Sequence, residues 1–294
     1  WRDYHQFVKS INPDAYLVGE IWWQKWPDVL MDPAPYMQGD VFDAVMFYQV
    51  YKPARSFFNN SDDAIDAKQL RDSLERQWNR IPGRNEYAMM NVGASHDAPR
   101  LLSDFYNKNR YKFKANPEEN AAYKTGKPDK EAYQRVRLYL VHLFTTIGSP
   151  QIWNGDEMGM WGADDPNCRK PLMWPELKFE KEYRNNFQPG AKQYDKIGFN
   201  KKHFEFYRKL IQLRKENPVL SFGSFKFLVN EGKKLGYSRS DEANEIIVFF
   251  NLENSKSNFE LPEGDFIDLL TGKKFENRSI ILKPMEAVVL KKIN

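Results

Sequence analysis

The stretch Tyr16-Leu-Val-Gly-Glu-Ile-Trp22 is a short apolar run with one carboxylate near its end. Runs of this length that contain β-branched residues are typical of a buried parallel strand. Glu20 stands where this strand is predicted to end, and in a β/α barrel the carboxyl ends of the strands form the active-site face. Because burial of a lone glutamate is costly, the carboxylate is expected either to pair with a cation or to take part in chemistry.

A second stretch repeats this arrangement. Met89-Met-Asn-Val-Gly-Ala-Ser-His-Asp97 is an apolar strand followed by His96 and Asp97. For one strand alone, a salt bridge at the strand end would be the better interpretation. Two strands that bring carboxylates to one rim indicate instead a hydrolase that uses carboxylates.

The chain up to residue 217 alternates predicted strands and helices, which implies parallel βαβ units. Further strands are predicted over 41–47 and from Gln151, and the segment 107–130 is predicted to be a surface excursion. Helices are predicted up to Ile11, over 65–81 with Asp62 as the N-cap, over 133–147 and around 204–211, ending before Pro218. Four strands are half of the eight in a (β/α)8 barrel. The fold class is therefore α/β, with the C-terminal half of a TIM barrel over residues 1–217.

The pattern changes after residue 217. Short strand-like runs at 225–229, 246–250, 266–268, 280–282 and 287–290 are separated by Gly, Asn and Asp. Such spacing is typical of an antiparallel sandwich. Residues 218–294 are therefore predicted to form an all-β domain.

Composition excludes several classes of protein. Charged residues make up 29% of the chain but the net charge is only +4, which gives no broad electrostatic case for nucleic acid. Cys168 is the single cysteine, so an internal disulfide framework is excluded. No run approaches the roughly 18 apolar residues of a membrane span. The compartment stays open, with a periplasmic or extracellular location preferred to a cytoplasmic one. The opening Trp1-Arg-Asp-Tyr-His-Gln-Phe resembles the middle of an amphipathic helix, so an upstream part is expected.

These residues also carry a family resemblance. Val18-Gly-Glu-Ile-Trp22 and Ser95-His-Asp-Ala-Pro-Arg100 resemble two signature regions of the α-amylase family, glycoside hydrolase family 13. Trp153-Asn-Gly-Asp-Glu-Met-Gly159 and Asp164-Asp-Pro-Asn-Cys-Arg-Lys-Pro-Leu-Met-Trp174 resemble the end of its eighth strand and the following loop. Together with Gly39-Asp-Val-Phe-Asp-Ala-Val-Met46, the last of these is most similar to the branch of neopullulanases, cyclomaltodextrinases and maltogenic amylases.

The resemblance implies roles for individual residues. It makes Glu20 the general acid/base and Asp97 the carboxylate that binds sugar hydroxyls and supports the transition state. It makes His96 a hydroxyl-binding partner. It places Asp165 and Arg169 on the non-reducing side of the scissile bond, although a salt bridge that fixes the loop explains this pair equally well.

Other candidates are assigned more simply. Trp22 is assigned to substrate binding. Trp23 and Trp26 are either sugar platforms or a hydrophobic lid packed on itself. Arg100 is expected to form a structural ion pair behind the site. Asp156 and Glu157 are given structural roles first, and Asp43, which lies inside a strand pattern, is left out of the site.

A retaining glycosidase needs an acid and a nucleophile about 5–5.5 Å apart. The acid must stay protonated near neutral pH, so apolar neighbours or a second carboxylate should raise its pKa. Val18, Ile21 and Trp22, with Asp97 across the rim, are expected to supply this environment for Glu20. The family nucleophile, an aspartate in an Arg-x-Asp context, and a strand that ends in Asn-His are not found before Glu20. We therefore predict no activity for residues 1–294 alone. The resemblance also places the commonest calcium ligands of the family in the missing part, so we predict no metal for this chain, and no cofactor.

The predicted function is the hydrolysis of α-1,4-glucosidic bonds in maltooligosaccharides, cyclodextrins, pullulan or starch, with retention. The alternatives are a transglycosylase or α-1,6-glucosidase on the same scaffold, and a non-catalytic glucan-binding protein. Ala98 and Phe47 depart from the family pattern, which leaves the fine specificity open. The Glu20 and Gln151 strands should also have unpaired edges, and a homodimer through the open half-barrel would cover them.

Overall fold

The computed structural model describes residues 1–26, 29–59, 61–108, 112, 114–184, 193–276 and 278–293. Within them the helices are α1 (Arg2–Ile11), α2 (Tyr48–Asn59), α3 (Ala67–Trp78), α4 (Leu101–Tyr106), α5 (Lys130–Thr145), α6 (Lys201–Glu216) and α7 (Val219–Phe222), with 3-10 turns η1 (Ala34–Tyr36) and η2 (Asn85–Tyr87). The strands before α6 are β1 (Val18–Gly19), β2 (Trp23–Lys25), β3 (Val29–Leu30), β4 (Ala44–Val45), β5 (Met90–Asn91), β6 (Ser149–Pro150), β7 (Glu182–Tyr183) and β8 (Tyr194–Asp195).

Four of these strands form the predicted parallel array. β1 pairs with β4, a bridge between Met46 and Met90 joins β4 to β5, and β5 pairs with β6, all in parallel. Helices α2 and α3 connect β4 to β5, and α4 and α5 connect β5 to β6. In the described part of the chain, β1 and β6 each pair on one side only. The prediction of half a TIM barrel is confirmed.

The strand and helix boundaries differ from the predicted ones. The predicted strands over 16–22 and 41–47 each shorten to two residues, since the ladder between them consists only of Val18 with Ala44 and Gly19 with Val45. The last parallel strand begins at Ser149 and not at Gln151. Asp66, not Asp62, caps α3, since its carboxylate accepts from the Gln69 amide while the Gln69 side chain accepts from the Asp66 amide.

The predicted surface excursion over 107–130 is partly buried, with its residues 109–111 and 113 outside the described ranges. Tyr123 and Ala115 are fully buried and pack against Ala163. Asn107 fixes the segment, because its side chain donates to the Lys124 carbonyl at 3.0 Å and accepts from the Lys124 amide at 2.8 Å. Because this segment is rich in Lys and Asn, its buried residues were not predicted from the sequence.

The C-terminal part is the predicted antiparallel sandwich. Its strands are β9 (Ser224–Glu231), β10 (Lys234–Ser240), β11 (Glu245–Asn251), β12 (Ser257–Glu260), β13 (Asp265–Asp268), β14 (Lys274–Phe275), β15 (Ser279–Leu282) and β16 (Glu286–Ile293). Six of them form a sheet in the order β14-β13-β16-β11-β10-β9, and β12 pairs with β15. Sequence analysis missed β10, β12 and β14.

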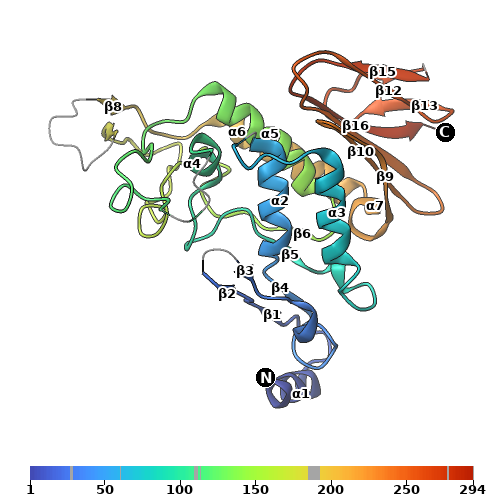
Figure 1. Ribbon diagram of the computed structural model, residues 1–294, viewed down its shortest axis with the longest axis horizontal. Coiled ribbons are helices and arrows are strands. Elements are labelled where there is room, and N and C mark those ends of the chain that lie inside the picture. The colour runs from blue at the N-terminus through green and yellow to red at the C-terminus, as the bar shows by residue number, and fades with distance from the viewer. Residues whose placement is uncertain are drawn as a thin grey trace.

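Strand β11 shows how the sheet joins the half-barrel. Ile247 and Phe249 pack with Phe259 of the smaller sheet, whereas Val248 and Phe250 belong to the core shared with the helices. This alternation is the two-residue period of a strand with both faces covered. Figure 1 shows the sheets at the C-terminal end of the molecule, next to α5, α6 and α7. Since the core is continuous, the predicted division at 217/218 stays a proposal.

One buried arginine closes two helix ends at this junction. Arg239 donates to the carbonyls of Thr145 and Thr146 at the end of α5 and to those of Leu220 and Gly223 around α7. The last carbonyls of a helix lack partners inside the helix, and a cation is favourable there. Burial lowers the pKa of Arg239 to about 10, and the side chain remains charged at neutral pH.

Helix α1 lies at the opposite end of the molecule (Figure 1) and has no buried residue. Its apolar side chains Phe7 and Ile11 are exposed. It is held by polar contacts such as the ion pair between Lys9 and Asp43 at 2.9 Å, and by the ring of its N-cap Trp1, whose centroid lies 5.6 Å from that of Phe42. No helix among the described residues is both long enough and apolar enough to cross a membrane.

Candidate active site

Glu20 directly follows β1, where the parallel strands end. Its side chain is exposed, and its carboxylate accepts a hydrogen bond from the Tyr48 hydroxyl at 2.9 Å. Tyr48 is the first residue of α2, the helix that closely follows β4. The predicted apolar surrounding is not found within the described residues, because Ile21 is buried in the main core while Glu20 is exposed beside the free edge of β1.

The Tyr48 ring packs against an aromatic neighbour. The ring of Trp22 meets that of Tyr48 edge to face, with centroids 5.3 Å apart, and the ammonium of Lys112 lies 5.3 Å from the Trp22 ring. Trp23 and Trp26 also pack edge to face, with centroids 4.8 Å apart, as expected if they form a lid. Sequence analysis missed Tyr48, although its place just after a strand that ends at the rim was a usable signal.

His96 and Asp97 lie beyond the end of β5. The Asp97 amide donates to the Ser95 hydroxyl at 3.1 Å, which turns the chain after the strand. One Asp97 carboxylate oxygen is 3.3 Å from Nε2 of His96. The imidazole also lies beside Trp153, with ring centroids 6.0 Å apart. The predicted pair is therefore together, and both side chains remain partly open to solvent.

Arg169 joins the following loop to this pair. Its guanidinium donates to the Asp97 carboxylate at 2.9 Å and to the His96 carbonyl at 3.0 Å, and it forms an ion pair with the Asp165 carboxylate at an N to O distance of 2.6 Å. This geometry provides the loop-fixing salt bridge that was one of the two interpretations. Because nearly half of the Arg169 and Asp165 side chains is exposed, both also remain accessible to a ligand.

A small pocket lies between the Glu20–Tyr48 pair and the network of His96, Asp97 and Arg169. Its wall includes Trp22 and Tyr48 from the Glu20 side and Asp97 and Lys112 from the other side. The cavity holds about 20 Å³, which is room for about one water molecule. The pocket is therefore too small to enclose a ring-sized ligand.

Behind the rim, Arg100 and Asp156 form the predicted structural ion pair, with an N to O distance of 2.9 Å. Both are almost fully buried, and Arg100 also donates to the Asn154 carbonyl at 3.0 Å. Burial raises the pKa of Asp156 to about 6, although the neighbouring Arg100 acts in the opposite direction. Glu157 accepts from the Gly155 amide at 2.8 Å, also a structural contact.

Two further titratable residues make structural contacts outside the site. Burial raises the pKa of the Cys168 thiol to about 11, and the thiol donates to the His96 carbonyl at 3.1 Å. Asp43 accepts from the Leu17 amide at 2.7 Å and pairs with Lys9, which agrees with leaving it out of the site. Across the described ranges, no group of three or more His, Cys, Asp or Glu side chains is arranged to hold a metal ion.

Comparison with known proteins identifies the family. The family described as "Alpha amylase, catalytic domain" matches residues 1–223. The chain is 31% identical over 281 residues to a cyclomaltodextrinase of Geobacillus thermopakistaniensis, covering 94% of this chain and 39% of that protein. It is 28% identical over 301 residues to neopullulanase 2 of Thermoactinomyces vulgaris, covering 99% of this chain and 42% of that protein.

Solved structures show the same fold. A cyclomaltodextrinase structure matches with a TM-score of 0.72 and 25% identity, covering 100% of this chain and 43% of the other. An Anoxybacillus α-amylase matches with a TM-score of 0.71 and 22% identity, covering 99% of this chain and 55% of the other. The chain thus spans about two-fifths of the length of the curated relatives it matches. On the match over residues 1–223, this chain belongs to the α-amylase family of glycoside hydrolases.

Proposed function

We propose that the full-length protein hydrolyses α-1,4-glucosidic bonds in maltooligosaccharides, cyclodextrins, pullulan or starch, with retention at the anomeric carbon. The observation that carries this proposal is that two groups of polar side chains lie on the same rim, at the carboxyl ends of β1 and β5. Glu20 is held by Tyr48 on one side, and Asp97, His96 and Arg169 form a network on the other side. The names of the relatives, cyclomaltodextrinase and neopullulanase, support the choice of substrate.

In this proposal Glu20 donates its proton to the glycosidic oxygen as the bond to the anomeric carbon breaks. The same carboxylate then removes a proton from the water that releases the product, as retention requires. Tyr48 orients the carboxylate through its hydrogen bond. The Asp97 carboxylate holds sugar hydroxyls and offsets the positive charge that develops on the sugar.

Retention also requires a carboxylate nucleophile, and we assign none to this chain. We therefore propose that residues 1–294 alone do not turn over glucans. The free edges of β1 and β6 could also be covered by a second copy of the chain. Light scattering on a verified 1–294 chain tests this pairing, and a glucan assay on the same sample tests its inactivity.

The test of the function is a product assay on the full-length protein with maltoheptaose, β-cyclodextrin and pullulan side by side. Short maltooligosaccharides released with retained anomeric configuration are the expected result. Products longer than the substrate would indicate the alternative transglycosylase, and selective cleavage of α-1,6 bonds would indicate the α-1,6-glucosidase. Binding without any product would overturn the proposal of an enzyme.

A further inference from the structure

Lys112, in the partly buried segment over 107–130, lines the small pocket between the two groups of rim residues. Its neighbours in the pocket wall include Trp22, Tyr48 and Asp97. The Lys112 side chain is only 12% exposed, and a lysine is rarely so buried unless its ammonium has partners. Because little of the side chain is left to contact a ligand, Lys112 is suited to act through its neighbours.

On one side, the Lys112 ammonium lies over the ring of Trp22, 5.3 Å from the ring centroid. A cation within about 6 Å of a ring centroid is attracted to the face of the ring. Trp22 follows Glu20 by two positions, and its ring packs against Tyr48, which donates to Glu20. The ammonium therefore contacts an aromatic group that stands beside the candidate general acid.

On the other side, the Lys112 ammonium forms an ion pair with Asp164, at an N to O distance of 3.3 Å. The same Asp164 oxygen accepts a hydrogen bond from the Asp165 amide at 2.9 Å. The Asp165 carboxylate pairs with Arg169, and Arg169 donates to Asp97. A continuous series of contacts therefore runs from the Lys112 ammonium to the group of rim residues that contains Asp97.

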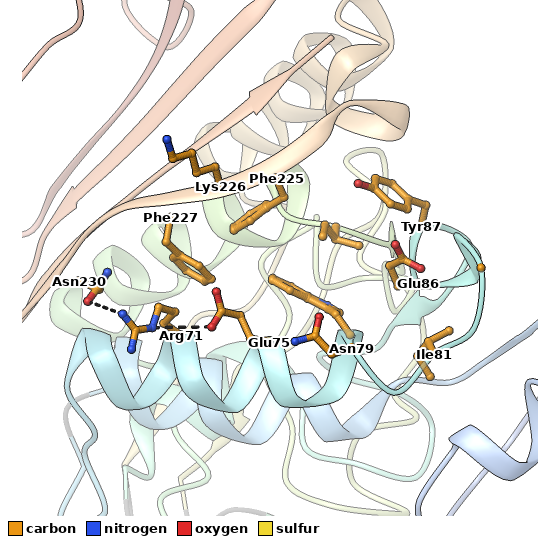
Figure 2. A pocket seen from close by; sticks show the side chains of 13 residues that line it. Arg71, Glu75, Asn79, Ile81, Glu86, Tyr87, Phe225, Lys226, Phe227 and Asn230 are labelled. Carbon is orange, nitrogen blue, oxygen red and sulfur yellow. Dashed lines mark hydrogen bonds and ion pairs between the residues drawn. The ribbon is translucent and has the colours of Figure 1, made fainter.

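A second cation joins two distant segments at the opposite end of the half-barrel. Arg71 of α3 donates to Asn230 of β9 at 3.1 Å and lies 3.8 Å from the Glu75 carboxylate (Figure 2). The groove that these residues line includes Ile147, which precedes β6, so the groove lies at the amino ends of the strands. The rim lies at their carboxyl ends. Arg71 is therefore a matched control for Lys112.

We infer that Lys112 is a positioning residue, which links Trp22 to the loop after β6 through Asp164 and so holds the two groups of rim residues at a fixed spacing. The link itself follows from the contacts of the ammonium, and its effect on the turnover of α-glucans rests on the proposed function. Catalysis by two separate groups depends on their spacing, since a misplacement of about 1 Å can lower the rate about 10²-fold.

The test compares Lys112→Met with Arg71→Met in the full-length protein, assayed on maltoheptaose. Methionine keeps most of the length of the lysine side chain and removes the charge. For Lys112→Met, kcat should fall about tenfold or more and KM should change less than about threefold, because the spacing matters most in the transition state. Arg71→Met should leave both constants unchanged. An unchanged kcat in Lys112→Met would overturn the inference.

A second variant separates positioning from stability. Lys112→Met leaves Asp164 largely buried without its cation, which can destabilise the fold. The double substitution Lys112→Met with Asp164→Asn removes both charges, so its melting temperature should return toward that of the wild type while kcat stays low. Recovery of kcat together with the melting temperature would show that the ion pair is only structural, and would overturn the inference.

A third comparison tests whether Lys112 acts through Trp22. In a Trp22→Leu background the link is already broken, so the further change Lys112→Met should lower kcat by less than about twofold. If the tenfold loss were also found in that background, the ammonium would not act through the Trp22 ring, and the inference would be overturned.

Hydrogen exchange separates this inference from the proposed function, because it needs no substrate. The amides between Asp165 and Arg169 should exchange faster in the variant with Lys112→Met and Asp164→Asn than in the wild type, and at the wild-type rate in Arg71→Met. Faster exchange in a full-length protein that cleaves no α-glucan would preserve the link and overturn only the proposed function. Unchanged exchange would overturn the inference.

Discussion

The active-site rim and the junction with the β-sandwich hold their charges in opposite ways. At the rim, Asp97 and Arg169 are partly exposed and pair with each other. At the junction, Arg239 is fully buried, donates hydrogen bonds to backbone carbonyls and lies over the ring of Tyr87. A charged side chain at the rim can exchange its partner for a sugar hydroxyl. Removal of Arg239, in contrast, would leave the carbonyls at the ends of α5 and α7 without their hydrogen bonds. Substitutions should therefore separate activity from stability, and four experiments test that separation.

The largest effect is expected from Arg239→Ala. It leaves buried carbonyls of α5 and α7 unpaired, so the free energy of unfolding should fall by at least about 3 kcal/mol. Denaturant titration measures this change. Arg278→Ala, at an exposed arginine, is the control and should have little effect. A loss below about 1 kcal/mol would show that the junction does not depend on this residue.

Asp97→Asn should act on turnover and not on folding. Loss of the carboxylate that offsets developing positive charge should lower kcat on maltoheptaose by about 10²–10³-fold. Because Asp97 is partly exposed, the melting temperature should change little. A collapse of the melting temperature would instead place Asp97 with the structural residues such as Arg239.

The dependence of stability on pH tests whether the buried His203 is neutral in the folded protein. It is fully buried between Tyr133 and Tyr207, and burial lowers its pKa to about 4. The unfolded chain takes up a proton near pH 6.5 and the folded chain only near pH 4, so stability should fall as the pH drops through this window. The full effect is about 3 kcal/mol.

His203→Phe should remove that share of the pH dependence, measured as unfolding free energy at several pH values between 4 and 7. The slope should decrease without vanishing, because burial also lowers the pKa of His142, to about 3. An unchanged slope would contradict the assignment of a neutral buried imidazole at His203.

The smallest effect is expected from Tyr48→Phe, which removes the hydrogen bond to Glu20 and keeps the ring against Trp22. Turnover of maltoheptaose should fall about tenfold, as for one hydrogen bond to a charged group. An activated aryl glycoside, which leaves without a proton, should lose less. Tyr51→Phe is the matched control, since the Tyr51 hydroxyl also meets a carboxylate, that of buried Asp104, and should affect stability instead. Equal losses on both substrates would refute a positioning role for Tyr48.

The sequence predicted the order of the elements because the buried strands and amphipathic helices carry clear periods. It could not predict their limits. The α3 cap moved to Asp66 because a capping box there uses Gln69. Strand β10 was missed because only a short apolar stretch lies between Lys234 and Ser240. Arg239 in this strand is buried through contacts with helices that are distant in the sequence.

The site residues could be named from the ends of two strands, but their partners could not. The Tyr48 hydroxyl reaches Glu20 across 28 positions, and Arg169 reaches Asp97 across 72. Such contacts depend on the parallel pairing of β1 with β4 and on the fold of the loop after β6. The apolar surrounding predicted for Glu20 is not formed, because no described strand pairs with β1 on the side away from β4.

The central claim is that Glu20 supplies the proton to the leaving sugar. Its most direct test is Glu20→Gln in the full-length enzyme, assayed on maltoheptaose and on an activated aryl maltoside, with binding measured separately. We expect turnover of maltoheptaose to fall by at least about 10²–10⁴-fold, with binding nearly unchanged and a smaller loss at the first step for the activated substrate. Turnover of maltoheptaose near the wild-type rate would contradict the claim.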